Sequence, residues 1–393
     1  MDKIINLGIP HVAELVFESI DTPGLFQCAL VSETWKVLAE NVLIKRWKGK
    51  MLDACEIGET KVVQLLLERC NSEESGLNIK DEYGATALII SCKNGHKDVV
   101  QLLLIHSDSN IELNATNTIF GWTAFITACH NGHKDVVQLL LAYSEPNIDL
   151  NARDKNGSTA FMLACHKRHK DVVQLILDHS EPNIDLNARD SDGWTAFMLA
   201  CYEGHKDIVQ LLLAYSETKI DLNARTNKGS TAFMLACYEG QKDVVQLLLA
   251  YSETKIHLNA RSNKGWTAFM LACNEGHKDV VQLILDHSES SIDLNAKEEE
   301  YGGTAFMMAC IEGRTGVVKL ILDHPSQKID LNARDNDGDD AFIIALENDD
   351  SPIQLLMLLE PYCFNNPKRK KLCLDWDLDT ARPLVKTLGS EYY

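Results

Sequence analysis

Residues 81 to 350 consist of eight copies of one short sequence. The clearest copy spans residues 190 to 220 and contains GWTAFMLAC followed by GHKDIVQLLL. The copies are separated by 36 or 37 residues. A constant period of this size predicts stacked supersecondary units, because each unit can bury its apolar face only against its neighbours. One position in every copy is marked by a threonine or, in the last copy, an aspartate: Thr86, Thr123, Thr159, Thr195, Thr231, Thr267, Thr304 and Asp340.

The charge of the chain is concentrated in the copies. The net charge is −19, while the first fifty residues are balanced and residues 361–393 are slightly basic. An acidic field disfavours nucleic acid and anionic membranes and favours a basic partner, although solubility alone is an equal explanation. The chain shows no signal peptide and no apolar run near the ~20 residues of a membrane span. We therefore expect neither nucleic acid nor a membrane as a partner.

The cysteines of the copies recur at one position. Equivalent atoms in adjacent copies should lie about 8–10 Å apart, which exceeds the ~7 Å Cα separation that a disulfide tolerates. We therefore expect reduced, buried thiols and a cytoplasmic protein, with the nucleus as an alternative. The repeated cysteines are Cys92, Cys129, Cys165, Cys201, Cys237, Cys273 and Cys310.

The local sequence of one copy predicts two helices. Residues 190–193 (DSDG) have turn chemistry, and Thr195 suits the N-cap of a helix over 196–202 that Gly204 ends. A second helix is expected over 205–215, followed by a connector whose Ile220 and Leu222 point to the next copy. Apolar residues at helical spacing predict one buried stripe on the second helix: Ile208, Leu211, Leu212 and Tyr215.

This copy resembles an ankyrin repeat, which consists of turn, helix, turn, helix and extended loop. The chain keeps the family's threonine, its paired glycines and its valine- and leucine-rich second helix. It departs consistently at the family's Pro-Leu-His, as in Ala196, Phe197 and Met198, and its period exceeds the usual ~33 residues. Arg168 stands where the other inner copies have glycine, so left-handed backbone is expected there. The resemblance implies a protein-binding surface.

The copies degrade at both ends of the repeat region. Asp340 replaces the threonine of the last copy, and residues 348–350 (NDD) replace its Gly-His turn. Residues 52–67 match the second part of a copy. Polar, atypical terminal copies are expected because the outermost ones face water. We therefore expect about nine repeats over residues 51–360 and a C-terminal tail over 361–393, whose packing stays open.

The first fifty residues follow another pattern, which resembles an F-box. Val12, Val16 and Ile20 have helical spacing, a turn follows over residues 21–24 (DTPG), and apolar positions then continue at helical spacing to Leu38. Ile9-Pro10 is one residue closer to Ile20 than is usual in the family. The pairs and single residues that carry the resemblance are Ile9-Pro10, Ile20-Asp21, Leu25, Val31-Ser32 and Trp35.

The expected fold is all-α: an ankyrin-repeat solenoid preceded by a three-helix F-box-like module over residues 5–48. No flexible linker separates the two, since residues 47–50 (WKGK) lead directly into the first repeat. F-box modules bind the Skp-type adaptor of cullin ubiquitin ligases; the alternative is a helical cap on the repeats. The resemblance implies these adaptor-binding residues: Ile9, Pro10, Val12, Val16, Ile20, Val31 and Trp35.

The target surface is expected along the first helices and the turns. The residue before the N-cap is a tryptophan in alternate copies, at Trp122, Trp194 and Trp266, and a small residue in the copies between them. This alternation suggests pockets about two copies apart. Tryptophan is a frequent interface anchor, although each ring could instead fold back on its neighbour. Glutamates beside aromatic residues would form an acidic ridge, or only a solvated face. With the tryptophans, these residues predict a site for a basic, partly apolar segment: His130, Tyr202, Glu203, Tyr238, Glu239, Glu275 and Glu312.

Other chemical signals are weak. Cysteine and histidine recur four residues apart, as in Cys129 and His133, but repetition in almost every copy indicates a structural role. No phosphate-binding or dinucleotide-binding glycine motif occurs. We expect no catalysis, metal or cofactor. Residues 367–371 (PKRKK) could serve in nuclear import.

Together these features predict a substrate-recognition subunit of a Skp–cullin–F-box ubiquitin ligase, with the target on the ankyrin concave face. The alternative is a non-catalytic ankyrin scaffold or adaptor without ligase contact. A third possibility is an effector that acts on the ligase of another organism's cell.

Overall fold

The computed structural model describes most of the repeat region and the C-terminal two thirds of the head, here defined as residues 1–50. The described ranges are 15–47, 49–69, 78–106, 111–143, 148–179, 184–215, 220–251, 256–287, 292–324 and 329–347, with residues 355, 358 and 359. Within these ranges the elements are helices, and no strand occurs beyond one isolated antiparallel bridge between Lys297 and Thr304. Ile9, Pro10, Val12 and the tail over 361–393 lie outside them.

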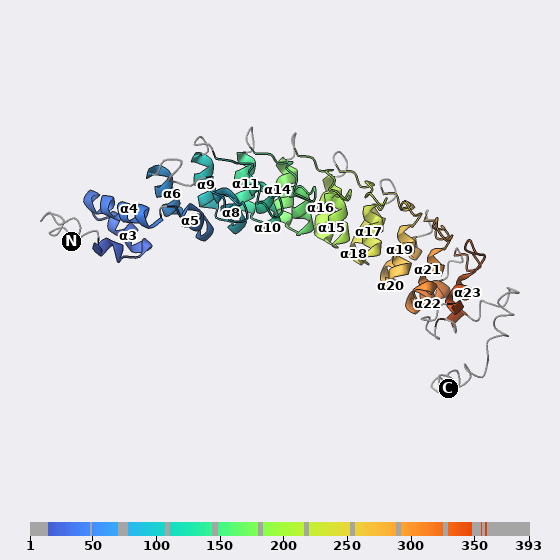
Figure 1. The fold of residues 1–393 in the computed structure, drawn as a ribbon. Coiled ribbons are helices and arrows are strands. Elements are labelled where there is room, and N and C mark those ends of the chain that lie inside the picture. The colour runs from blue at the N-terminus through green and yellow to red at the C-terminus, as the bar shows by residue number, and fades with distance from the viewer. Residues whose placement is uncertain are drawn as a thin grey trace, which may run out of the picture. The chain divides into compact units, whose positions relative to one another are not determined.

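The chain divides into two units, Met1–Ser191 and Asp192–Tyr393. Figure 1 shows both as successive helix pairs. The first unit contains α3 (Thr22–Ala29), α4 (Glu33–Trp47), α5 (Met51–Ile57), α6 (Thr60–Arg69), α8 (Ala87–Asn94), α9 (Lys97–Ile105), α10 (Ala124–Asn131), α11 (Lys134–Ala142), α13 (Ala160–His166) and α14 (Lys170–His179). The second contains α15 (Ala196–Tyr202), α16 (Lys206–Tyr215), α17 (Ala232–Tyr238), α18 (Lys242–Ala250), α19 (Ala268–Glu275), α20 (Lys278–His287), α21 (Ala305–Ile311), α22 (Thr315–Asp323) and α23 (Ala341–Glu347).

From α8 onward, the first helix of each repeat begins as the sequence predicts, whereas α5 of the first repeat has no side-chain cap. The Thr123 hydroxyl accepts a hydrogen bond from the backbone N–H of Ile126 at 3.2 Å, which satisfies a donor that the helix leaves free. Asp340 caps α23 in the same way and accepts from the N–H of Phe342 at 3.1 Å. Between the two helices a glycine has positive φ, as at Gly204 (φ 72°). The caps therefore fix the helix starts locally, within each repeat.

The repeats stack through like helices. Within the first unit α5, α8, α10 and α13 contact one another in series, and α6, α9, α11 and α14 do the same; the second unit repeats this from α15 to α23. The apolar residues of both helices are buried between neighbours, and Phe125 and Cys129 illustrate the first helix. This arrangement buries a continuous core although no single repeat could do so.

The buried stripe of the second helix differs from the prediction. In α16 the buried residues are Ile208, Val209, Leu212 and Leu213, whereas the predicted Leu211 and Tyr215 are half-buried. The second helix packs against the first helix of its own repeat and against the neighbouring second helix. Its buried face is therefore wider than the predicted stripe and includes Val209 and Leu213. The helix itself begins at Lys206, one residue after the predicted start.

The connectors between repeats are tied by asparagine side chains. In the first unit the Asn114 side-chain oxygen accepts from the N–H of Asp149 in the next repeat at 2.9 Å. In the second unit Asn223 accepts from the N–H of His257 at 2.8 Å. Ile220 and Leu222 are buried, as predicted for residues that point toward the next repeat. The connectors therefore add directional bonds to the apolar stacking.

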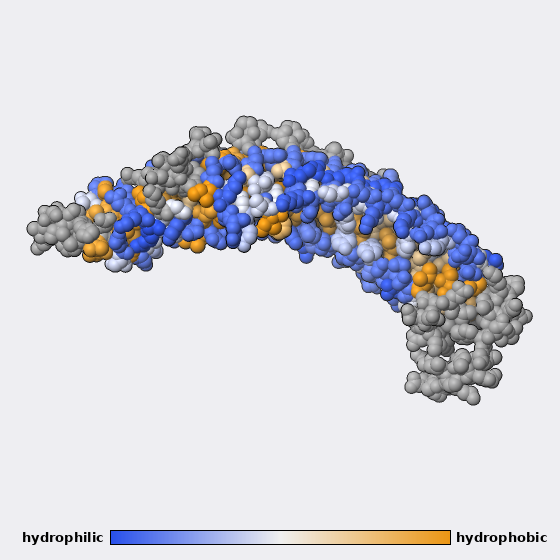
Figure 2. Space-filling view, in the orientation of Figure 1, coloured by the Kyte–Doolittle hydropathy of each residue, from blue (hydrophilic) through white to orange (hydrophobic). Residues whose placement is uncertain are grey.

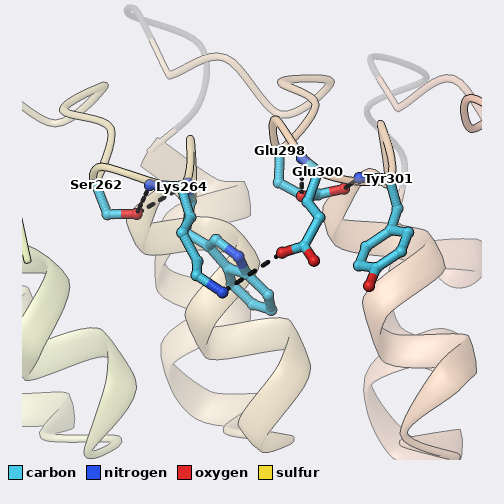
Figure 3. Close-up of polar contacts among 6 residues, drawn as sticks. Ser262, Lys264, Glu298, Glu300 and Tyr301 are labelled. Atoms are coloured by element: carbon cyan, nitrogen blue, oxygen red, sulfur yellow. Dashed lines mark hydrogen bonds and ion pairs between the residues drawn. The ribbon is translucent and has the colours of Figure 1, made fainter.

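The turn before each first helix is built around one polar side chain (Figure 3). The Ser262 hydroxyl accepts from the backbone N–H of Trp266 at 3.1 Å. Glu298 takes the equivalent place in the next repeat and accepts from the N–H of Tyr301 at 2.7 Å and of Gly303 at 3.0 Å. Burial raises the pKa of Glu298, but these backbone bonds outweigh it and hold the pKa below its usual value. The turns are consequently rigid supports for the residues beside them.

The head consists of helical residues 15–18 followed by α3 and α4. Phe17 is fully buried and meets the Trp35 ring edge-on, with centroids 5.6 Å apart. The buried cluster around Phe17 also contains Leu65 from α6, and α4 contacts α6 directly. The head is thus packed on the first repeat without a linker, as predicted. Residues 1–14 of the head lie outside the described residues.

Arg168 has φ 61° and is the one non-glycine residue with positive φ in the described part of the chain, which confirms the predicted left-handed backbone. The nine cysteines of the described ranges are free, and those in the repeats are buried. Among the helices described, none has both the length and the apolar character needed to cross a bilayer.

Candidate protein-binding surface

The predicted target residues lie on the first helices and the turns that precede them. Trp122, Trp194 and Trp266 each come directly before an N-cap threonine, and all three are half-buried. Half-burial leaves part of each ring exposed to solvent. The contacts of Trp122 and Trp194 differ between the two units.

In the first unit Trp122 packs on its neighbours. Its ring stacks on Phe120 at 4.7 Å and lies tilted over His130 at 4.4 Å. Its indole N–H donates to the Asp154 carboxylate in the next repeat at 3.3 Å. Burial lowers the pKa of His130, which favours the neutral imidazole beneath the indole. The alternative of a ring folded onto its neighbours therefore describes Trp122 well.

Three exposed apolar residues near Trp122 were not among the predicted residues. Tyr83, Ile119 and Phe120 are each about half exposed and lie in turns. The N–H of Thr118 donates to the carbonyl of Tyr83 at 2.8 Å, so the two turns are adjacent. The signal in the sequence was the apolar pair Ile119-Phe120 in a turn that is polar in most other copies.

In the second unit Trp194 has an aromatic partner on the helix that follows it. The rings of Trp194 and Tyr202 meet edge-to-face with centroids 5.2 Å apart. Trp194 precedes α15 and Tyr202 ends it, so the two rings lie along the exposed side of one short helix. A side-chain hydrogen bond to Glu239 of the next repeat is the main cause that raises the pKa of Tyr202 to about 12.

A groove of about 640 Å³ opens beside this aromatic pair. Ser230, which has tryptophan at the equivalent position of both neighbouring repeats, contributes to its lining. Three successive repeats of the second unit contribute to its walls. The residues that line it are Asp192, Trp194, Tyr202, Thr226, Asn227, Lys228, Ser230, Leu235, Tyr238 and Leu271.

The predicted acidic ridge is partly engaged in the protein itself. Glu203 and Glu312 are exposed, and Glu312 lies 3.9 Å from the guanidinium of Arg314. Glu275 accepts from the side-chain amide of Asn274 at 3.0 Å, and Glu239 binds the hydroxyl of Tyr202. The ridge therefore offers carboxylates beside aromatic rings, but not four free ones.

The repeated cysteine and histidine residues do not form reactive pairs. Burial raises the pKa of the Cys129 thiol, so the nucleophilic thiolate is suppressed. The imidazole of His133 is bonded through Nε2 to the backbone carbonyl of Lys93 at 2.9 Å. Among the described residues no group of three or more metal-binding side chains comes together. These contacts agree with the structural role that the repetition indicates.

The head presents apolar side chains to solvent (Figure 2). Of the predicted adaptor-binding residues in the described range, Val16 and Val31 are exposed, Val31 at 57%. Ile20 and Trp35 are half-buried and pack on the cluster around Phe17. Leu15, Leu30 and Val37 add to the exposed apolar surface of the head, and Leu30 is 80% exposed.

These features together define a class: stacked helix pairs that present a shared surface to other proteins. A family model of ankyrin repeats matches overlapping windows of the chain at residues 50–117, 109–190, 144–226, 180–261, 218–298 and 254–335. The chain therefore belongs to the ankyrin-repeat family and is a protein-binding scaffold. A search of curated proteins finds no match for it.

Proposed function

We propose that the chain is a substrate-recognition subunit of a Skp–cullin–F-box type ubiquitin ligase, in which the repeats bind the target. The observation that carries the target site is the groove beside Trp194, because it combines aromatic anchors with an opening of suitable size. Interfaces concentrate their binding energy in such anchors, with tryptophan and tyrosine the most frequent. The protein acts by holding its partners and performs no chemistry on them.

The exposed apolar residues of the head support its role in adaptor binding. Leu30 and Val31 follow α3 and are solvent-exposed although both are apolar, and Val16 is exposed on the preceding helix. An exposed apolar patch on a small module is typical of a protein interface. Because α4 packs on α6, the adaptor would be held at a fixed position relative to the first repeat.

Target binding is tested with two alanine variants. Trp194→Ala and Trp266→Ala should each weaken binding of a target identified by crosslinking, while the melting temperature changes by only a few degrees, because both rings are half-buried. Binding is measured by titration of the purified target. Unchanged affinity, or loss of the folded state, would contradict the proposed surface.

Adaptor binding is tested with the full chain and a purified Skp-type adaptor. Val31→Asp should abolish the complex, because a charge on an apolar interface cannot be desolvated cheaply. Ile57→Asp is the matched control, since Ile57 is equally exposed (59%) but lies at the end of α5, outside the head. If the unmodified chain forms no complex with the adaptor, the ligase role fails and the alternative remains: an ankyrin scaffold without ligase contact.

A further inference from the structure

We propose that the groove beside Trp194 binds an arginine side chain that a partner protein presents. This inference rests on the proposed function and specifies the chemistry of the partner at that site. It follows from the size of the groove, its aromatic rim and its charge.

The groove has room for a long, thin side chain. Ser230 occupies the position that carries tryptophan in the repeats on either side, at Trp194 and Trp266, so the missing indole leaves the opening. Leu235 and Leu271 line the groove as apolar surface. The methylene stem of an arginine could pack on these leucines while its charged end remains at the rim.

The rim is aromatic. Trp194 and Tyr202 stand edge-to-face on one side, and Tyr238, 40% exposed, lines the groove from the next repeat. A guanidinium group is attracted to aromatic faces within about 6 Å, and its planar shape allows stacking that an ammonium group does not offer. The aromatic rim therefore favours a cation, and arginine over lysine.

The charge around the rim favours the same occupant. Asp192 lines the groove, the Glu239 carboxylate is held at the Tyr202 hydroxyl, and Glu203 is exposed directly after Tyr202. Lys228 is the one cationic residue among those that line the groove, and it is exposed. The lining itself therefore holds one carboxylate and one ammonium group, and Glu203 and Glu239 add two carboxylates beside the aromatic rim. With the acidic field of the repeats, these surroundings favour a cation.

The probe is a fluorescent peptide, Gly-Ser-Leu-Arg-Leu-Ser-Gly, whose binding to the full chain is measured by anisotropy. A second peptide contains citrulline, which keeps the shape of arginine but has no charge. We expect at least fivefold weaker binding of the citrulline peptide, and a smaller loss for a lysine peptide. Equal binding of the arginine and citrulline peptides would overturn the inference.

A filled groove provides the matching protein variant. Ser230→Trp should abolish peptide binding, because it restores the indole that neighbouring repeats carry. The change is compatible with the fold, since the backbone N–H of Ser230 makes the turn bond to Thr226 at 3.1 Å, and Trp266 makes the same bond with Ser262. Ser158→Trp, at the equivalent position of the first unit, is the control and should bind the peptide normally.

Two further variants test the charge argument, and the outcomes separate the two proposals. Glu239→Gln should weaken binding of the arginine peptide severalfold, and Lys228→Ala should strengthen it. If Ser230→Trp blocks a crosslinked target but all the peptides bind alike, the target site stands and the arginine inference is wrong. If Ser230→Trp and Ser158→Trp bind the arginine peptide equally well, the groove is not its site.

Discussion

The imidazole of His133 donates from Nε2 to the backbone carbonyl of Lys93 at 2.9 Å, a bond that joins one repeat to the preceding one. Because a carbonyl can only accept, this contact fixes the tautomer of the ring. Where histidine is absent, the Gln241 side-chain amide donates to the carbonyl of Tyr202 at 2.9 Å, and Arg314 Nε donates to that of Asn274 at 2.7 Å. The position therefore requires an N–H donor of sufficient reach.

The first prediction follows from this requirement. His133→Gln should leave the free energy of unfolding nearly unchanged, whereas His133→Ala should lower it by about 1 kcal/mol, because the bond to Lys93 is lost. Urea unfolding followed by circular dichroism measures both. Equal destabilisation by glutamine and alanine would mean that the imidazole ring, through its packing, is what the position needs.

A substitution at Arg168 is expected to raise the free energy of unfolding rather than lower it. Its φ of 61° is unfavourable for a side chain with a Cβ, so Arg168→Gly should stabilise the protein by up to about 1 kcal/mol. The matched variant is Gly132→Ala at the equivalent turn of the preceding repeat, where φ is 74° and a Cβ would clash with the imidazole of His169. That variant should destabilise by at least a similar amount. Thermal unfolding measures both, with a raised melting temperature expected for Arg168→Gly and a lowered one for Gly132→Ala.

Cysteine reactivity should follow burial. Cys28 is half-exposed, whereas Cys165 and Cys201 are fully buried and burial raises the pKa of both thiols. With iodoacetamide at pH 8, Cys28 should be labelled in the native protein, and the two buried thiols only after unfolding. Mass spectrometry of the peptides gives the extent at each site. Rapid native labelling of Cys165 would contradict its burial.

The same thiols predict a loss of stability at high pH. In the unfolded chain a cysteine ionises near its ordinary pKa of 9.0, whereas the raised pKa of Cys165 keeps its thiol protonated in the folded protein. The unfolded state therefore releases protons first, so stability falls as the pH rises above about 9. Each such thiol contributes about 1.4 kcal/mol per pH unit.

Cys165→Ala isolates one of these contributions. Lysine and tyrosine side chains titrate in the same range, but they are present in both the unmodified chain and the variant. The difference between the two slopes of unfolding free energy against pH therefore reports the Cys165 thiol alone. Urea unfolding at several values between pH 9 and 11 should show a slope that is smaller by about 1.4 kcal/mol per pH unit in the variant. Identical slopes would show that Cys165 ionises in the folded protein.

The sequence predicted local structure with good precision. Thr195 as N-cap, the helix over 196–202 and the glycine turn after it are all observed, because a cap and a turn depend on residues within one copy. The stripe on the second helix was wrong by one position at Leu211 and Tyr215, since periodicity alone does not show how many neighbours a helix contacts. Tyr83 and Phe120 were missed because exposure depends on the adjacent turn.

The candidate sites were only partly predictable. The alternation of tryptophan and small residues suggested pockets, and the structure has a groove beside Trp194 with Ser230 in its lining. Trp122 packs on Phe120 and bonds to Asp154, whereas Trp194 lies on the rim of a groove. The sequence could not predict this contrast, because the two tryptophans occupy identical positions in their copies. It arises from the different residues that surround each ring.

The sequence by itself determined the repeat, its two helices and its family, because period, caps and apolar spacing are written into every copy and act over a few residues. Only the tertiary structure decided the partner of each histidine, the bond between Tyr202 and Glu239, and the groove lined by three repeats. These features join side chains from different copies, and their distances are set by how the helices stack.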